Sequence, residues 1–395
     1  MPDNSKKLLV VILTQQLTKH TYKQFNCNLR YKNWKILFLN VLPIVNKKLF
    51  NESLNVHSLK KRKNFVYLKN LNHLLKEINK IQKPFGYINL VRNLKISLFD
   101  ILLKKKGGKK IYLESDQFIP AKVNFFSGFK FYFKVNKIFL IRKIFELLYA
   151  YVIKTIFKIL SPSNDLFFIG DFAKYKILKK KLGNKKVFNI DNHDFEKYNL
   201  SKKRLRKKYI VYIDQDFGED FDHKLNKLFP KKDFDKADYW HKLELFFRNI
   251  EKNYPQYKVK VAAHHRRNKI NFSLKRKFIF NRTLDLIRDA KLVVGSSSSA
   301  FAYAILAKKP ILLLSHDSFK YYSYRVLVDL NFLKKKLGLK IFNLNNVYNS
   351  KLLNKIDLFK YDDKKYKLYT DNIIANPQMI LKGNMWKKIL VVLNK

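Results

Sequence analysis

The chain has 395 residues, of which 47% are hydrophobic and 15% aromatic, so it is long and apolar enough to form two domains. Its 83 lysines and arginines outnumber 30 acidic residues, which indicates either attraction to polyanions or the lysine-rich composition of an AT-biased genome. A single cysteine, Cys27, excludes a disulfide framework and a cysteine-based zinc cluster and is consistent with a reducing cytoplasm. The N-terminus predicts no signal peptide, because Leu8–Leu13 is the only apolar run before glutamines intervene.

The first half of the chain alternates short apolar runs, which predict strands, with segments of helical spacing. The expected strands are Leu8–Leu13, Trp34–Leu42, Phe65–Tyr67, Pro84–Leu90, Lys110–Leu113, Asp165–Gly170 and Lys186–Ile190. Helices are expected at Asn70–Lys80 and Leu94–Lys105. Alternation of this kind is typical of βαβ units and therefore predicts a parallel sheet.

The segment Lys137–Leu160 is strongly apolar but is interrupted by charged side chains. Its longest uncharged run, Leu147–Ile153, is far shorter than the roughly 20 residues needed to cross a bilayer. On a helical wheel the charges fall within one half, which predicts an amphipathic helix with a basic face. Such a helix either rests on anionic lipid or covers a sheet, and both interpretations stay open.

A dense basic run, Ser201–Lys208, predicts the boundary between two domains. Beyond it, strands are expected at Tyr209–Ile213, Lys258–Ala263, Leu292–Val294 and Ile311–Leu314, and helices at Asp238–Asn253, Asn281–Ala290 and Ala300–Ala307. This second series of βαβ units predicts a second parallel sheet.

Three polar clusters directly follow strands of this second series. The clusters are Asp214-Gln215-Asp216, then His264-His265-Arg266-Arg267, then the four serines Ser296, Ser297, Ser298 and Ser299. In open α/β sheets, ligands bind outside the carboxyl ends of the strands. The three clusters are therefore predicted to contribute to one site.

The four serines precede the helix expected at Ala300–Ala307. A helix start carries unpaired N–H groups and the positive end of the helix dipole, so it suits an anion. One serine suffices for a helix cap, and four indicate a hydroxyl-lined pocket for a phosphate. A hydrolase nucleophile elbow fits poorly, because Gly295–Ser299 lacks the second glycine and His316-Asp317 follow too soon and in the wrong order.

The histidine and aspartate clusters each allow two interpretations. Arg266 suits a phosphate because arginine forks onto its oxygens, and His264 or His265 suits a general acid toward a leaving phosphate. The alternative is a basic loop with no ligand. Asp214 and Asp216 suit a general base or a divalent metal beside a diphosphate, and the alternative is an acidic turn that caps a strand.

Several well-known motifs are absent from the sequence. It contains no G-x-G-x-x-G, no P-loop and no H-E-x-x-H, which argues against a dinucleotide site of the usual kind, a P-loop nucleotide site and a zinc protease. Nothing matches the RRM aromatics or a KH loop, so no specific nucleic-acid partner is expected.

These residues resemble bacterial surface-polysaccharide glycosyltransferases of the GT-B architecture, in particular the capsule and sialyltransferase-like groups. The matching positions are Asp214, Asp216 and Gly218 in YIDQDFGED, His264 and Arg266 in AAHHRR, and Ser297 to Ser299 in GSSSSAFAYAILAKKPILLL. The resemblance covers Tyr209 to Asp317, with weaker likeness at Tyr22–Pro43 and Asp191–Tyr198. His265 stands where the family has proline, which leaves open which histidine contacts the ligand.

The resemblance implies an α/β, GT-B-like fold with two Rossmann-like domains facing a central cleft. Residues 1–205 form the expected acceptor-side domain and 206–365 the nucleotide-sugar-binding domain, with a helical segment, 366–395, crossing back to the first. It implies an inverting, metal-independent transfer from a nucleotide-activated sugar to a surface-polysaccharide or lipopolysaccharide acceptor, with no cofactor. The alternatives are a sugar-nucleotide 2-epimerase on the same fold and a non-enzymatic, basic polyanion-binding protein.

In this interpretation the expected catalytic residues are His264, Asp214 and Asp216, and no metal site is expected. The expected donor phosphate-binding residues are His265, Arg266, Ser296, Ser297, Ser298 and Ser299. The expected partners are a nucleotide-sugar donor and a glycan or lipid-linked glycan acceptor, with peripheral contact to an anionic membrane. The expected location is the cytoplasm, at the inner face of the cytoplasmic membrane.

Overall fold

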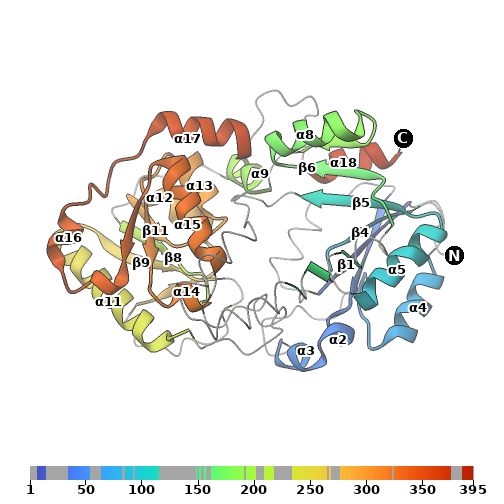
Figure 1. Ribbon diagram of the computed structural model, residues 1–395, viewed down its shortest axis with the longest axis horizontal. Helices are drawn as coiled ribbons and strands as arrows, with labels where there is room; N and C mark the ends of the chain where they lie inside the picture. The colour runs from blue at the N-terminus through green and yellow to red at the C-terminus, as the bar shows by residue number, and fades with distance from the viewer. Residues whose placement is uncertain are drawn as a thin grey trace. The chain divides into compact units, whose positions relative to one another are not determined.

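The structure is a computed structural model that divides into two compact units. The first consists of residues 1–115, 145–190 and 378–395, and the second of residues 116–144 and 191–377. The structure describes residues 7–14, 34–53, 64–81, 85–91, 94–114, 148, 151–152, 155–156, 162–190, 193–201, 209–217, 234–264, 267, 276–322, 324–374 and 385–394. Each unit contains one parallel sheet with helices packed on it (Figure 1).

The first unit contains a seven-stranded sheet in which all neighbouring strands are parallel. Its strands are β1 (Lys7–Leu13), β2 (Trp34–Asn40), β3 (Phe65–Tyr67), β4 (Phe85–Asn89), β5 (Lys109–Glu114), β6 (Leu166–Ile169) and β7 (Val187–Asn189). They lie in the order β3-β2-β1-β4-β5-β6-β7. The sheet therefore grows from β1 toward one edge and then from β4 toward the other.

The helices of the first unit come from both ends of the chain. They are α2 (Leu42–Val45), α3 (Lys47–Ser53), α4 (Leu71–Asn79), α5 (Leu94–Lys105), α8 (Phe172–Leu182) and α18 (Met385–Asn394). The strand expected at Trp34–Leu42 ends at Asn40, because the Asn40 side chain accepts a hydrogen bond from the N–H of Leu42 and Pro43 then opens α2.

The central strand β1 is buried on both faces, as its unbroken apolar sequence predicts. Leu9, Val11 and Leu13 lie in one hydrophobic cluster, whereas Val10 and Ile12 lie in another. The first cluster also contains Trp386, Ile389, Leu390 and Leu393 of α18, and the second contains buried residues of α4 and α5. The C-terminal helix is therefore part of the core of the first unit.

The second unit contains a six-stranded parallel sheet. Its strands are β8 (Tyr209–Ile213), β9 (Lys258–Ala262), β10 (Phe278–Ile279), β11 (Leu292–Gly295), β12 (Ile311–Ser315) and β13 (Lys340–Asn343), in the order β10-β9-β8-β11-β12-β13. Its helices are α9 (His193–Leu200), α11 (Lys236–Asn253), α12 (Thr283–Asp289), α13 (Phe301–Leu306), α14 (Phe319–Tyr322), α15 (Tyr324–Leu337), α16 (Ser350–Asn354) and α17 (Asp363–Tyr369), with the short turns η1 (Leu344–Asn346) and η2 (Thr370–Ile374).

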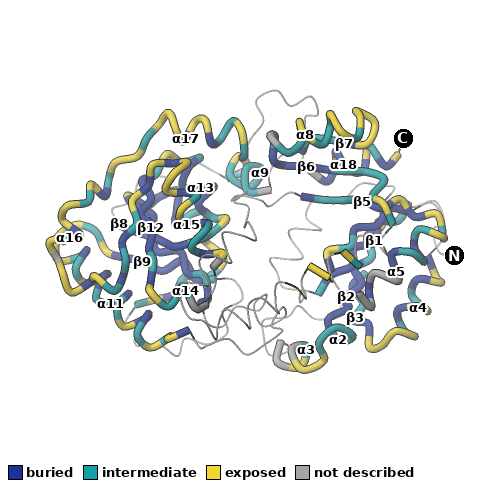
Figure 2. Tube along the Cα trace, viewed as in Figure 1, coloured by how far each residue is buried: buried dark blue, intermediate teal, exposed yellow. Residues whose placement is uncertain are grey.

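The core of the second unit follows the helical and strand periodicities of the sequence. Trp240, Leu243, Phe247 and Ile250, spaced for one face of α11, are all buried. Figure 2 shows burial concentrated on the strands, with exposed residues on the outer sides of the helices. Both units have the alternating β and α elements expected from the sequence, and the predicted α/β class with two Rossmann-like domains is confirmed.

Most of the amphipathic segment predicted at Lys137–Leu160 lies outside the described residues. Within that segment, residues 148, 151, 152, 155 and 156 are described and are helical. No helix in the described part of the chain is both long and apolar enough to span a bilayer.

The packing of α18 predicts that the C-terminal helix stabilises the first unit. Replacing Trp386, which is 1% exposed, with alanine leaves a cavity in the core and should lower the free energy of unfolding by about 3–5 kcal/mol. Val391→Ala, on the same helix but exposed, should change it by no more than about 0.5 kcal/mol. Urea denaturation of both variants measures this difference, and equal stabilities would show that α18 is not part of the core.

Candidate active site

The second sheet changes its direction of winding between β8 and β11. From β8 the chain moves to β9 and β10 on one side, and then returns to place β11, β12 and β13 on the other. At such a switch point the loops that leave the two neighbouring strands diverge and open a crevice at the carboxyl edge. Asp214 and Asp216 follow β8, His264 follows β9 and the serines follow β11, so the described residues of the three predicted clusters lie at this edge.

Asp214, at the end of β8, is buried and hydrogen-bonded through both carboxylate oxygens. Arg267 donates to it twice, from Nε to Oδ2 at 2.5 Å and from Nη2 to Oδ1 at 2.7 Å. The backbone N–H groups of Asp216 and His264 also donate to this carboxylate, at 3.0 and 3.1 Å. Asp214 therefore joins the loop after β8 to the loop after β9.

Arg267 is the cation that balances this buried carboxylate. Burial alone would lower the pKa of its guanidinium, but the hydrogen bonds to Asp214 and the charge of that carboxylate raise the pKa above the ordinary value. The guanidinium carbon lies 5.0 Å from the ring centroid of Trp240 and 5.7 Å from that of Phe278. The predicted ligands His265 and Arg266 lie outside the described residues.

Asp216 and His264 face each other beside this ion pair. Asp216 has φ 55°, a left-handed conformation that is uncommon for a residue with a side chain and often marks a functional site. Its Oδ1 lies 3.2 Å from Nη2 of Arg267, and its Oδ2 lies 3.9 Å from Nδ1 of His264. The His264 side chain is 28% exposed and that of Asp216 is 4% exposed. The imidazole therefore reaches solvent, whereas the carboxylate beside it is buried.

The segment Ser296–Ser299, here called the serine loop, begins immediately after Gly295. A Cβ on Gly295 would lie 3.2 Å from the ring of Phe301, so that ring would have to shift slightly, and 3.5 Å from Ile213, an ordinary contact. Ser296 is fully buried, Ser297 and Ser298 are partly buried, and Ser299 is exposed. Three serines of the loop therefore reach the surface of the edge.

Ser297 connects the serine loop to two other parts of the second unit. Its backbone N–H donates to Oε1 of Gln215 at 2.8 Å, which bridges the β8 and β11 loops across the switch point. Its hydroxyl donates to Oδ2 of Asp329 on α15 at 2.7 Å. Burial raises the pKa of Asp329, against the hydrogen bond from Ser297 and the charge of Arg325.

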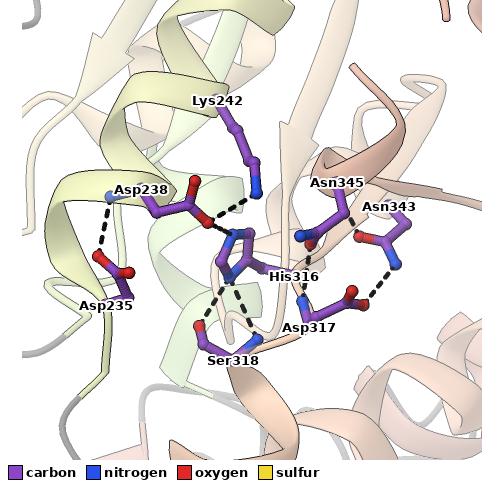
Figure 3. A network of polar contacts seen from close by, with 8 residues as sticks. All are labelled: Asp235, Asp238, Lys242, His316, Asp317, Ser318, Asn343 and Asn345. Atoms are coloured by element: carbon purple, nitrogen blue, oxygen red, sulfur yellow. Dashed lines mark hydrogen bonds and ion pairs between the residues drawn. The ribbon is translucent and has the colours of Figure 1, made fainter. Parts of the chain in front are cut away.

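A separate polar network surrounds His316, which follows β12 (Figure 3). Its Nε2 lies 3.0 Å from Oδ2 of Asp238, and its Nδ1 lies 2.6 Å from Oγ of Ser318. The N–H of Ser318 also donates to Nδ1, so that nitrogen is the acceptor and Nε2 carries the proton toward Asp238. The network ties α11 to the end of β12.

Three further residues of this edge hydrogen-bond to the predicted clusters. Arg267 and Gln215 lie in segments that the sequence indicated, but no role was predicted for either, and Asp329 was not indicated at all. For Arg267 a signal was present, since it ends the same basic run as Arg266 and two aspartates stood at a neighbouring predicted strand end. Asp329 carried no comparable signal, because it lies on a helix 32 residues beyond Ser297.

Comparison with known proteins supports the fold. No protein-family model matches the chain, and no curated protein is similar to it in sequence. The wall teichoic acid polymerase TagF is similar in structure (TM-score 0.50, 14% identity, 99% of this chain and 90% of the polymerase covered). So are the UDP-GlcNAc 2-epimerase from Methanocaldococcus jannaschii (0.48, 13%, 98% and 99%) and the calicheamicin glycosyltransferase CalG4 (0.47, 8%, 99% and 99%).

At these identities the similarity concerns the fold alone. The likeness to the polymerase, together with the two parallel sheets, confirms the expected GT-B-like class. Any inference about the activity therefore depends on the residues at the carboxyl edge of the second sheet.

The Asp214–Arg267 pair predicts a large loss of stability when one partner is removed. Asp214→Asn should lower the free energy of unfolding by about 1.5–3 kcal/mol, because the buried Arg267 guanidinium then loses its two hydrogen bonds to a charged carboxylate and keeps the ion pair with Asp216. The matched control is Asp357→Asn, whose exposed pair with Lys360 should be worth less than about 1 kcal/mol. Urea denaturation compares the two, and similar small effects would mean that the buried pair does not hold the loops.

The His316 network predicts a dependence of stability on pH. Burial lowers the pKa of His316 below its ordinary 6.5, although Asp238 opposes this, so the unfolded chain takes up the proton first as the pH falls. The stabilisation is present above pH 6.5 and is lost as the pH falls through the folded pKa. The pKa of Asp238 is also lowered from 3.8, chiefly by Lys242 against its own burial, and that contribution is lost only in more acidic solution.

Urea midpoints measured from about pH 7.5 to pH 5 test this expectation. The wild type should lose stability over this range, and His316→Asn should be less stable at neutral pH but have a flatter profile. His241→Asn, which replaces an exposed histidine on α11, should keep the wild-type profile. A profile that is unchanged in His316→Asn would contradict the assignment.

Proposed function

We propose that this chain is a glycosyltransferase that moves a sugar from a nucleotide-activated donor to a surface-polysaccharide or lipopolysaccharide acceptor. The observation that carries the proposal is the meeting of an imidazole, a carboxylate and a hydroxyl-rich loop at the β8/β11 switch point. Such an edge suits a ligand with both phosphate and hydroxyl groups. The proposed transfer is inverting and uses no metal or other cofactor.

His264 is the proposed general acid toward the leaving phosphate. Its ring is partly exposed, and its Nδ1 lies 3.9 Å from Oδ2 of Asp216. A protonated imidazole stabilises the negative charge that develops on the departing nucleotide and delivers a proton to it. His265, Arg266 and the exposed serines stay in the proposal as contacts to the donor phosphate.

The proposed base for the acceptor hydroxyl is Asp216. The sequence left this role open between two carboxylates, and the hydrogen bonds of Asp214 to Arg267 commit that residue to holding the loops. Oδ2 of Asp216 and Nδ1 of His264 lie 3.9 Å apart, more than a hydrogen-bond distance, and the proposal assigns the two groups to different substrate atoms. The acceptor, a glycan or lipid-linked glycan at the cytoplasmic face of a membrane, is part of the proposal.

A sugar-nucleotide 2-epimerase is the second candidate. That activity would need an acidic dyad to move protons on the bound sugar without any acceptor. Incubation with one labelled nucleotide sugar separates the two activities. An epimer formed without acceptor supports the epimerase, whereas label that moves only when a glycan acceptor is present supports the transferase.

The donor itself is accessible to a direct binding screen. CMP-, UDP- and GDP-sugars should be compared for their effect on the melting temperature, because a ligand that binds only the folded state raises it. One nucleotide class should stabilise the protein and the others should not. No stabilisation by any of them, together with steeply salt-dependent binding to polyanions, would favour a non-enzymatic protein instead.

The role of His264 predicts a large loss of turnover without loss of folding. His264→Ala should lower the turnover number by roughly 100- to 10,000-fold, the usual contribution of a general acid, while its urea midpoint stays near that of the wild type. His241→Ala removes an exposed histidine of the same unit and should leave turnover unchanged. Near wild-type turnover in His264→Ala would refute the role, and a chelator should leave the wild-type rate unaffected.

A further inference from the structure

The helix α8 and the turn after it form a strongly basic surface on the first unit, here called the lysine patch. Its six lysines are exposed, except Lys179, which is partly exposed: Lys176, Lys179, Lys180, Lys181, Lys185 and Lys186. Residues 172–190 contain no acidic residue. Within the described part of the chain, no carboxylate pairs with any of the six, whereas Lys174, on the inner side of α8, pairs with Glu114. The positive charge of the patch is therefore unbalanced.

The helix itself accounts for only part of this charge. The lysines at 179–181 lie in the last turn of α8, where they complement the negative end of the helix dipole. Lys176 precedes that turn, and Lys185 and Lys186 follow the end of the helix, so the dipole does not explain them. On α17, by contrast, the exposed Lys365 is balanced by Asp362 of the same segment. A local excess of one sign of charge favours a partner of the opposite sign.

Apolar side chains lie among these lysines. Ile177 is 66% exposed and, at 3.6 residues per turn, lies between Lys180 and Lys181 on the helix surface. The rings of Phe172 and Tyr175 are stacked, with centroids 6.0 Å apart. Nζ of Lys176 lies 4.4 Å from the centroid of the first ring, and Nζ of Lys179 lies 5.4 Å from that of the second. The patch therefore combines cations with an apolar side chain that faces solvent.

The same unit exposes a second apolar surface. Leu148, Tyr151 and Val152 are helical, and their spacing of three and four residues places them on one face of a helix. Each of the three is about half exposed or more. A helix face that covered a sheet would be buried. At these positions the structure therefore favours the lipid-bound interpretation of the segment Lys137–Leu160 over the sheet-covering one.

We propose that the lysine patch is a docking surface for an anionic lipid bilayer. The lysines contact the headgroups, where each strengthens binding by roughly fivefold, and Ile177 enters the boundary between headgroups and acyl chains. A soluble polyanion supplies the charge but no hydrocarbon for Ile177, so the exposed apolar side chains decide for lipid. The patch lies in the first unit and the proposed catalytic residues lie in the second, so the two assignments stand or fall separately.

Vesicle sedimentation at physiological ionic strength tests the charge of the patch. The full-length wild type should bind vesicles of phosphatidylcholine and phosphatidylglycerol and should not bind phosphatidylcholine alone. The triple variant Lys176→Gln, Lys180→Gln, Lys181→Gln should bind the anionic vesicles roughly a hundredfold more weakly. Its urea midpoint should stay near that of the wild type, because all three side chains are exposed.

The matched control is a triple variant of α15 in the second unit. Lys334→Gln, Lys335→Gln and Lys336→Gln remove the same charge from three exposed lysines, but residues 325–337 have no exposed large apolar side chain. This variant should lose less than roughly fivefold, the effect of a single lysine at the surface. An equal loss in the two triple variants would show that net charge alone attracts the protein, and would overturn the proposal.

The apolar contact is tested by Ile177→Ser, which should weaken binding to the anionic vesicles by roughly tenfold. Leu368→Ser on α17 replaces a side chain that is 64% exposed and should bind as the wild type does. Wild-type binding by Ile177→Ser would assign the patch to a soluble polyanion such as heparin and overturn the lipid assignment. Absence of vesicle binding by the wild type would overturn it as well and would leave the proposed function untouched.

Discussion

The buried ion pair between Asp214 and Arg267 is the interaction on which the strand edge of the second unit depends. Two charges taken out of water are tolerated only when their hydrogen bonds are well made. Here the carboxylate accepts from the guanidinium and from two backbone N–H groups, those of Asp216 and His264. The same contacts that satisfy Asp214 therefore set the backbone of the two residues proposed for catalysis.

The serine loop is held by a different kind of constraint, close packing. Gly295 lets the end of β11 approach β8 and the ring of Phe301, and Gln215 then reaches across to the N–H of Ser297. Ser296 is buried, whereas Ser297, Ser298 and Ser299 are partly or fully exposed, so the loop reaches the surface after its first serine. The ion pair between Asp214 and Arg267 therefore positions the loop after β8, whereas close packing at Gly295 and the hydrogen bond from Ser297 to Gln215 position the loop after β11.

Both parallel sheets are covered in part by helices that follow the last strand of their unit. In the second unit, α16 and α17 come after β13, and Leu353, Tyr366 and Tyr369 belong to its core. In the first unit, one face of β1 packs against α18, which lies near the end of the chain. Within the described residues, the buried apolar side chains of Trp386 to Leu393 complete the cluster on this face.

The sequence by itself determined the strands of the first unit, the four central strands of the second unit and which polar residues follow which strand, but it did not predict the edge strands β10 and β13. Local periodicity was sufficient for this, because a buried parallel strand is a continuous apolar run and a covering helix repeats about every 3.6 residues. Gly295 and the serines that follow it were visible for the same reason, since a break in the apolar run marks where a strand ends.

Only the tertiary structure decided which of these polar residues meet. It assigned Arg267 to Asp214 and Asp329 to Ser297. The separations along the chain are 53 residues for the first pair and 32 for the second, and no local pattern encodes a contact across such distances. The order of the strands determines these contacts, because it decides which loops lie next to each other at the carboxyl edge of the sheet.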